Sequence, residues 1–124
     1  MECAIELLPK RKIGAGVNRD LPLIIRKYVE ASNRHDVQAI LSCFSNDAVV
    51  HDEREALHGK KAIEGWIAKT IEKYKFRFKP LNLRDQESQV VVTIQVSGTF
   101  PGSPVTLDYK FKVDNDKIDS LAVD

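Results

Sequence analysis

The chain has 124 residues, of which 43% are hydrophobic and 30% are charged, and this length and composition fit one globular domain and leave little room for two. Its 19 basic and 18 acidic side chains leave a net charge of +1, which argues against a nucleic-acid partner because such proteins normally carry a basic face. No apolar run approaches the length of a membrane span, so we expect no membrane partner.

The first 19 residues have the weakest structural pattern, since one proline and two glycines interrupt them. We expect 1–19 to form a flexible or loosely docked N-terminal arm and 20–124 to form the domain. A strand or a partner contact built on Ile5, Leu7 and Leu8 is the alternative for the arm. The start also lacks the features of a signal peptide, which favours a cytoplasmic location.

Three helices are predicted in the first half of the chain. Asp20 can cap the first, with Pro22 in its first turn and Tyr28 in its apolar stripe. Asp36 caps a second, shorter helix that reaches Phe44. A short strand, 48–52, and a charged loop, 53–58, precede a third helix that opens at Gly59, and its buried stripe is Ile63, Trp66, Ile67, Thr70, Ile71 and Tyr74.

From Phe76 the apolar period changes to two, which predicts four successive strands. Pro80 shifts the phase, as at a bulge, and 114–116 is a tight turn before the last strand. Helices followed by strands indicate an α+β domain with a mainly antiparallel sheet. The inward positions of the strands include Val92, Ile94, Leu107, Tyr109 and Phe111.

The run from Tyr28 to Trp66 resembles the nuclear transport factor 2-like superfamily, which includes the SnoaL-like domains. The shared features are an aromatic residue on the first helix, the Asp36 cap, the strand start at 46–49 with Asp52 at its end, and His58-Gly59 before a helix with an aromatic residue. The resemblance covers about 20–124. It implies a curved, mixed, mainly antiparallel sheet wrapped around three N-terminal helices, a cystatin-like cone around one apolar pocket.

Within that superfamily the closest chemical comparison is ketosteroid isomerase, which similarly has a Tyr on its first helix and an Asp at the end of its first strand. The resemblance implies that Asp52 is a general base and Tyr28 an oxyanion donor. Two positions depart from the isomerase pattern. Glu53 stands where the isomerase has a proline, and Tyr109 occupies the position of its second, acidic donor, while Asp108 is expected on the other face.

Each candidate residue also has a structural interpretation. Asp52 could be an exposed turn carboxylate, and Tyr28 could belong to the core, with or without a hydrogen bond to Asp52. An aromatic and aliphatic set could line the pocket and bind substrate, or simply pack the core: Phe44, Trp66, Ile94, Leu107 and Phe111.

The histidines and cysteines form no pattern that indicates a metal or a cofactor, so we expect neither. His51 and Asp52 point to opposite faces of a strand, and His58 does not stand at ligand spacing, although it could cap the third helix. Cys3 and Cys43 have neither disulfide-scaffold nor zinc spacing, so we expect two reduced thiols.

Two main functions therefore compete. One is a cofactor-independent isomerase, cyclase or dehydratase that acts on an apolar carbonyl substrate by Asp-mediated proton transfer. The other is a non-catalytic ligand-binding or dimerisation module, and a carrier of a protein partner is a weaker third. Under either main hypothesis we expect a homodimer formed through the sheet, whose outer face carries Val91, Thr93 and Gln95.

Overall fold

The computed structural model describes residues 20–52, 55–86 and 88–124. The predicted N-terminal arm, 1–19, lies outside the described residues. Those residues form three helices and six strands, and the helices precede most of the sheet in the chain, as the patterns predicted. The class is α+β, and the sheet is mixed but mostly antiparallel.

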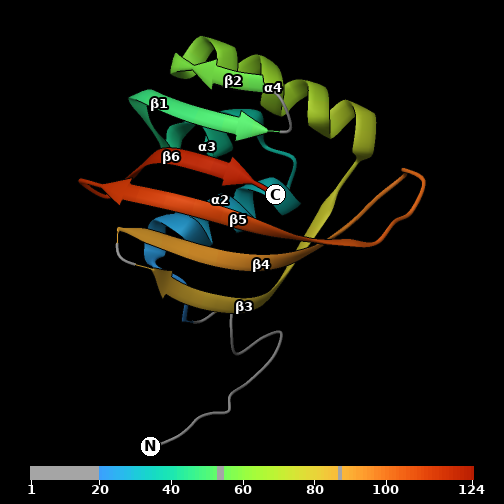
Figure 1. Ribbon diagram of the computed structural model, residues 1–124. Coiled ribbons are helices and arrows are strands. Elements are labelled where there is room, and N and C mark those ends of the chain that lie inside the picture. Colours follow the sequence, from blue (N-terminus) through green and yellow to red (C-terminus); the bar gives the residue numbers. More distant parts are fainter. Residues whose placement is uncertain (1–19, 53–54, 87) are drawn as a thin grey trace, which may run out of the picture.

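The helices pack on one face of the sheet (Figure 1). They are α2 (Leu23–Asn33), α3 (Val37–Ser42) and α4 (Gly59–Tyr74). Apolar residues recur at steps of three and four, so each helix turns one stripe to the sheet and leaves its polar side to solvent. The Asp36 carboxylate caps α3 by accepting a hydrogen bond from the Ala39 N–H at 3.1 Å, as predicted.

The six strands form one sheet in the order β2-β1-β6-β5-β4-β3. Their bounds are β1 (Phe44–Asp52), β2 (Glu55–His58), β3 (Arg77–Gln86), β4 (Gln89–Ser97), β5 (Val105–Asp114) and β6 (Lys117–Val123). Among the described strands, only the pairing of β1 with β6 is parallel. It brings the end of the first strand, Asp52, beside Val123 near the end of the chain.

Two predicted helix boundaries were wrong. Asp20 does not cap α2, because Pro22 is the N-cap residue and no side chain caps that end. The second helix ends at Ser42, and Phe44 begins β1 instead. Phe44 is fully buried and pairs with Ile118, whose N–H donates to the Cys43 carbonyl at 2.8 Å, so sheet pairing competes successfully with another helical turn.

The charged segment before the third helix was predicted as a loop, but its second part is the strand β2. This strand pairs antiparallel with β1, for example Val50 with Leu57. It lies at a sheet edge and is largely exposed, so it carries little of the hydrophobic signal that identifies a strand. His58 is the N-cap residue of α4, but its side chain makes no capping hydrogen bond.

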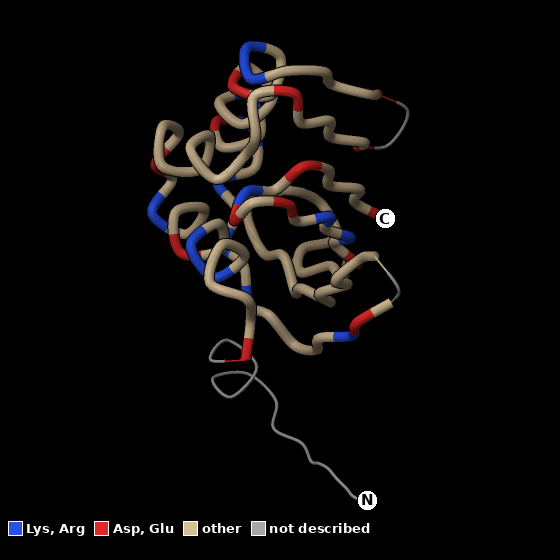
Figure 2. Tube along the Cα trace, turned by 90° about the vertical axis from the view of Figure 1, so that its left-hand side faces the viewer, with Lys and Arg blue, Asp and Glu red and all other residues tan. Residues whose placement is uncertain are grey.

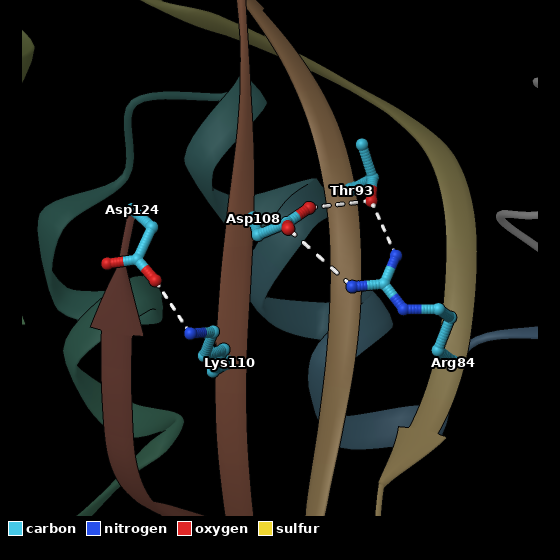
Figure 3. A network of polar contacts seen from close by, with 5 residues as sticks. All are labelled: Arg84, Thr93, Asp108, Lys110 and Asp124. Atoms are coloured by element: carbon cyan, nitrogen blue, oxygen red, sulfur yellow. Dashed lines mark hydrogen bonds and ion pairs between the residues drawn. The ribbon is translucent and has the colours of Figure 1, made fainter.

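The second half of the sheet follows the predicted alternation. The register between β3 and β4 shifts between Pro80 and Asn82, at the predicted bulge. Asn115 and Asp116 both have positive φ, at 52° and 61°, and form the predicted tight turn between β5 and β6. Tyr109 is buried on the helix-covered face, whereas Asp108 contacts Thr93 and Arg84 on the outer face (Figure 3).

One side chain joins the end of α2 to the edge strand β3. The Asn33 amide nitrogen donates to the Phe78 carbonyl at 3.0 Å, and its amide oxygen accepts from the Phe78 N–H at 2.7 Å. Nearby, a ring nitrogen of His35 lies 2.7 Å from the Phe76 carbonyl oxygen. These contacts fix the helix that carries Tyr28 against the strand that carries Phe78.

The surface carries both signs of charge. Figure 2 shows Lys and Arg interspersed with Asp and Glu along the described chain. None of the described helices has the length and apolar character needed to cross a bilayer. Cys43 is a buried free thiol, and burial raises its pKa.

Candidate functional site

A cavity of about 290 Å³ lies between the helices and the sheet. Its wall is mainly apolar and strongly aromatic, with residues from α2, α3 and α4, from β1 and β3 to β6, and from the β4–β5 connection. The aromatic members of this wall are Tyr28, Trp66, Tyr74, Phe76, Phe78, Phe100 and Tyr109. Such a wall favours an apolar ligand that a few polar groups orient.

The wall has a buried part and a half-buried part. Tyr28 and Tyr109 are only 2% and 6% exposed, and Phe76 and Phe78 are buried beside them. We call these four residues the floor. The other side of the wall is half-buried and includes Asp52, Trp66, Tyr74 and Phe100. The two tyrosines therefore lie deeper in the wall than the Asp52 carboxylate.

Asp52 reaches the cavity because it ends β1 between two neighbouring strands. It pairs with Glu55 of β2 on one side and with Val123 of β6 on the other. The Trp66 indole N–H donates to Asp52 Oδ2 at 2.8 Å. Since that bond occupies one carboxylate oxygen, Oδ1 is the oxygen left to act on a ligand. His51, its neighbour, is exposed, as alternation along the strand predicted.

Tyr28 is held by rings on several sides. Its ring centroid lies 5.5 Å from that of Phe111 and 5.9 Å from that of Phe44, both edge to face. Burial is the largest cause that raises the pKa of Tyr28 well above its ordinary value, and Tyr109 adds to this shift. The phenol therefore remains protonated at neutral pH and can donate a hydrogen bond.

Tyr109 projects from β5 into the same cavity. Its ring lies 5.3 Å from that of Phe78, edge to face, and 6.4 Å from that of Phe111. Burial raises the pKa of Tyr109 strongly, and the Asp52 carboxylate adds to the shift. Asp52 also raises the pKa of Tyr28, as the last of several causes, and all three residues line the same cavity.

Two hydroxyl groups in the wall are already engaged as donors. Ser32 Oγ donates to the Tyr28 carbonyl at 2.7 Å, and Thr70 Oγ1 donates to the Ile67 carbonyl at 3.0 Å. Each of them can only accept a hydrogen bond from a ligand while these bonds persist. Of the four floor residues, Tyr28 and Tyr109 are the two whose side chains carry a hydroxyl donor.

The structure distributes the predicted substrate-binding residues between cavity and core. Trp66 and Leu107 lie in the cavity wall, together with Asp52, Tyr28 and Tyr109. Three of the predicted residues are fully buried and do not belong to the wall: Phe44, Ile94 and Phe111. Phe44 and Phe111 instead pack behind Tyr28.

Sequence reasoning missed several wall residues. Thr70 and Tyr74 were predicted with Trp66 in the buried stripe of the third helix, at steps of four, but only Trp66 was assigned to the pocket. The alternating pattern at Phe76 and Phe78 predicted a strand, but it did not indicate that these side chains line the cavity. Phe100 lies in a connection with no periodic pattern, and nothing in the sequence pointed to it.

A sequence profile described as a SnoaL-like domain matches residues 25–120, and the chain belongs to this family. No curated protein matches the chain. A crystal structure from Sinorhizobium meliloti, described as a candidate polyketide cyclase, is 34% identical, with a TM-score of 0.82 over 86% of this chain and 98% of that one. The fold and the sequence therefore agree on the family.

More distant structures share the fold. A Catenulispora acidiphila protein with a ketosteroid isomerase-like fold, in complex with trimethylamine, is 17% identical, with a TM-score of 0.72 over 83% of this chain and 85% of that one. SalBIII, described as an epoxide hydrolase/cyclase-like enzyme of pyran ring formation in salinomycin, is 18% identical, with a TM-score of 0.72 over 87% and 89%. An uncharacterised cystatin-fold protein from Novosphingobium aromaticivorans also matches, at 16% identity and a TM-score of 0.71 over 82% and 95%.

Proposed function

We propose that this protein is a cofactor-independent enzyme that moves a proton next to the carbonyl group of an apolar small molecule. Asp52 Oδ1 takes a proton from the carbon beside the carbonyl, and the electron pair of the broken C–H bond shifts onto the carbonyl oxygen. Tyr28 and Tyr109 donate hydrogen bonds to the enolate oxygen that forms. Where the substrate is a β,γ-unsaturated ketone, the intermediate is a dienolate, and return of the proton to its γ-carbon completes an isomerisation.

The observation that carries this proposal is the meeting of one carboxylate and two buried phenols in one apolar cavity. Both phenols are buried among aromatic rings, so hydrogen bonds to developing negative charge are stronger there than in solvent. Formation of the enolate is also the first step of an aldol cyclisation, in which the enolate carbon attacks a second carbonyl. The description of the Sinorhizobium meliloti relative as a candidate cyclase is consistent with that variant.

The test is exchange of the α-protons of an apolar ketone in deuterated water, followed by proton NMR. 2-Tetralone is a suitable probe because it is small, apolar and bicyclic. The wild-type protein should accelerate exchange over buffer, and Asp52→Asn should lower the accelerated rate at least about 100-fold. The substitution preserves an acceptor for the Trp66 N–H but removes the base.

Asp108→Asn is the matched control, because it makes the same chemical change on the outer face of the sheet, where Asp108 pairs with Arg84 at 3.5 Å. This variant should exchange the ketone protons at the wild-type rate. Equal exchange by Asp52→Asn and by the wild type would refute the proton-transfer proposal.

The second candidate is a non-catalytic module that binds an apolar ligand. The Trp66–Asp52 hydrogen bond favours it, since that bond alone gives the half-buried carboxylate a structural role. A wild-type protein that binds 2-tetralone but exchanges none of its protons would support this alternative over the enzyme.

A homodimer formed through the outer face of the sheet remains part of the proposal. On that face Arg84 and Lys110 flank Val91 from the two neighbouring strands, and Val91 is fully buried. Their charges pair with Asp108 and Asp124 respectively (Figure 3). Charges that are already paired within one subunit cost less to bury against a second sheet, and a monomer mass in sedimentation at micromolar concentration would refute the dimer.

A further inference from the structure

The cavity is elongated, and two elements measure its length independently. Along α4 the wall residues are Trp66, Thr70 and Tyr74, which span eight residues or about 12 Å of helix axis. Along β5 the wall residues are Val105, Leu107 and Tyr109, and Tyr109 stands four residues or about 13 Å from Val105.

The two ends of this elongated cavity differ in chemistry. Trp66 and Tyr109 stand at the end that holds Asp52: Trp66 bonds its carboxylate, and Tyr109 pairs with Val123, which is also the β-partner of Asp52. At the opposite end Tyr74 packs on Phe100, and Val105 also lines the wall. A ligand therefore has its polar group at the Asp52 end and an apolar group beneath Phe100.

The backbone around Phe100 is fixed by several hydrogen bonds. The Thr99 N–H donates to the Tyr74 carbonyl at 2.9 Å, which ties the β4–β5 connection to the end of α4. Within the connection, the Gly98 N–H donates to Ser103 Oγ at 2.9 Å and the Ser103 N–H donates to the Phe100 carbonyl at 3.2 Å.

The Phe100 ring itself packs edge to face on Tyr74, with centroids 5.6 Å apart. A ring positioned by its own backbone and by a neighbouring ring is a fixed end wall. It limits how far a ligand can extend from Asp52.

We infer that the ligand is an elongated, singly polar carbonyl compound with an unbranched alkyl or flat aryl tail, and that Phe100 sets the maximum length of that tail. The placement of the carbonyl rests on the proposed function. The cavity volume of about 290 Å³ corresponds to roughly ten liquid-water volumes, and because the carbonyl end also occupies the cavity, this volume limits the whole ligand to about ten carbon atoms. Phe100 is a specificity-determining residue in this scheme and takes no part in the proton transfer.

The test is the binding of a series of 2-alkanones from six to fourteen carbons. Trp66 is the sole tryptophan of the chain and lies in the cavity wall, so its fluorescence reports occupancy directly. Calorimetry supplies an independent reading. Each added methylene should tighten binding about fourfold until the tail reaches Phe100, and affinity should then stop rising near ten carbons.

Two substitutions of Phe100 should move this limit in opposite directions. Phe100→Ala opens the end wall and should extend the limit by about three carbons, whereas Phe100→Trp fills more space and should shorten it. Leu23→Ala is the control, because Leu23 is 60% exposed on α2 and is not part of the cavity wall. Circular dichroism establishes that each variant is folded.

A limit that stays at the same chain length in both Phe100 variants would overturn the inference, and so would a wild-type protein that binds none of the series. Neither result depends on turnover, because the assay measures binding only. Conversely, failure of Asp52→Asn to slow proton exchange would refute the proposed function, while a limit that moves with Phe100 would still support the length-setting role.

Discussion

The Trp66 indole N–H and the Asp52 carboxylate are joined by a hydrogen bond of 2.8 Å that links the middle of α4 to the end of β1. The two residues are 14 positions apart in the chain, and β2 lies between them. The bond fixes the rotation of the carboxylate, so Oδ1 keeps one direction relative to the two tyrosines. Such orientation of a base is a recognised source of rate acceleration.

Replacing the indole tests that orientation. Trp66→Phe retains an aromatic ring in the wall but removes the N–H, so Asp52 can rotate away from the productive geometry. A hydrogen bond to a charged group contributes about 1.5–3 kcal/mol, and we expect the rate of ketone proton exchange at saturation to fall at least about tenfold. The ketone concentration that gives half the maximal rate should change less than threefold. If the ketone concentration that gives half the maximal rate changed by as large a factor as the saturated rate, Trp66 would mainly support binding.

The buried tyrosines should make the protein sensitive to alkali. Because the pKa of Tyr28 and that of Tyr109 are raised in the folded state, their contribution to stability is fully present below the unfolded tyrosine pKa of about 10. As the pH rises above 10, the unfolded chain releases protons that the folded chain keeps. The free energy of unfolding should then fall by about 1.4 kcal/mol per pH unit for each tyrosine, until the pH reaches its folded pKa.

Urea unfolding at pH 9, 10 and 11 measures this dependence. Tyr28→Phe and Tyr109→Phe should each reduce the slope above pH 10 by about one proton, and the double variant should reduce it by about two. Slopes that are the same in the single variants and in the wild type would contradict the prediction.

Two glycines give opposite predictions for the same substitution. A Cβ at Gly98 would lie 2.3 Å from the Tyr74 carbonyl oxygen, so Gly98→Ala must separate the β4–β5 connection from α4. We expect a loss of about 1–3 kcal/mol in the free energy of unfolding. At Gly65, on α4, a Cβ meets no atom within 4 Å, and Gly65→Ala should stabilise the protein by about 0.5–1 kcal/mol.

Thermal and urea unfolding of the two variants provide the measurement. Gly98→Ala should also weaken binding of the longest 2-alkanones, since it displaces Phe100, while Gly65→Ala should leave binding unchanged. Stabilisation by Gly98→Ala would show that the contact with Tyr74 is dispensable.

The Asn33 side chain should contribute more to the free energy of unfolding than an ordinary surface amide does. Asn33→Ala removes two hydrogen bonds and leaves the Phe78 N–H and carbonyl without that partner, which should cost about 2–3 kcal/mol in unfolding free energy. Asn46→Ala, at an exposed position of β1, is the control and should cost less than about 0.5 kcal/mol. Similar losses in the two variants would refute a special role for Asn33.

The sequence was sufficient for the fold class because its two hydrophobic periods are clear. Leu81 and Leu83 even showed the phase shift at Pro80 that the bulge explains. The period could not separate the last turn of α3 from the start of β1, since Phe44 suits either element. It also missed β2, whose exposed residues resemble those of a loop.

Alternation identifies the face on which a side chain lies but not its depth. Ile94 and Phe111 were correctly assigned to the helix-covered face, yet neighbouring side chains separate them from the cavity. Phe100 shows the converse: its place in the wall depends on the contact between the β4–β5 connection and the end of α4. Such a tertiary contact leaves no local pattern in the sequence.

The pairing of Asn33 with Phe78 also affects how the sheet can associate. β3 is the last strand in the order, so its backbone groups could template another strand. At Phe78 the Asn33 amide takes the place of that missing strand, because it satisfies one N–H and one carbonyl in the way a backbone peptide would. The chain thus protects its own sheet edge against intermolecular strand addition at the position where the edge adjoins the floor of the cavity.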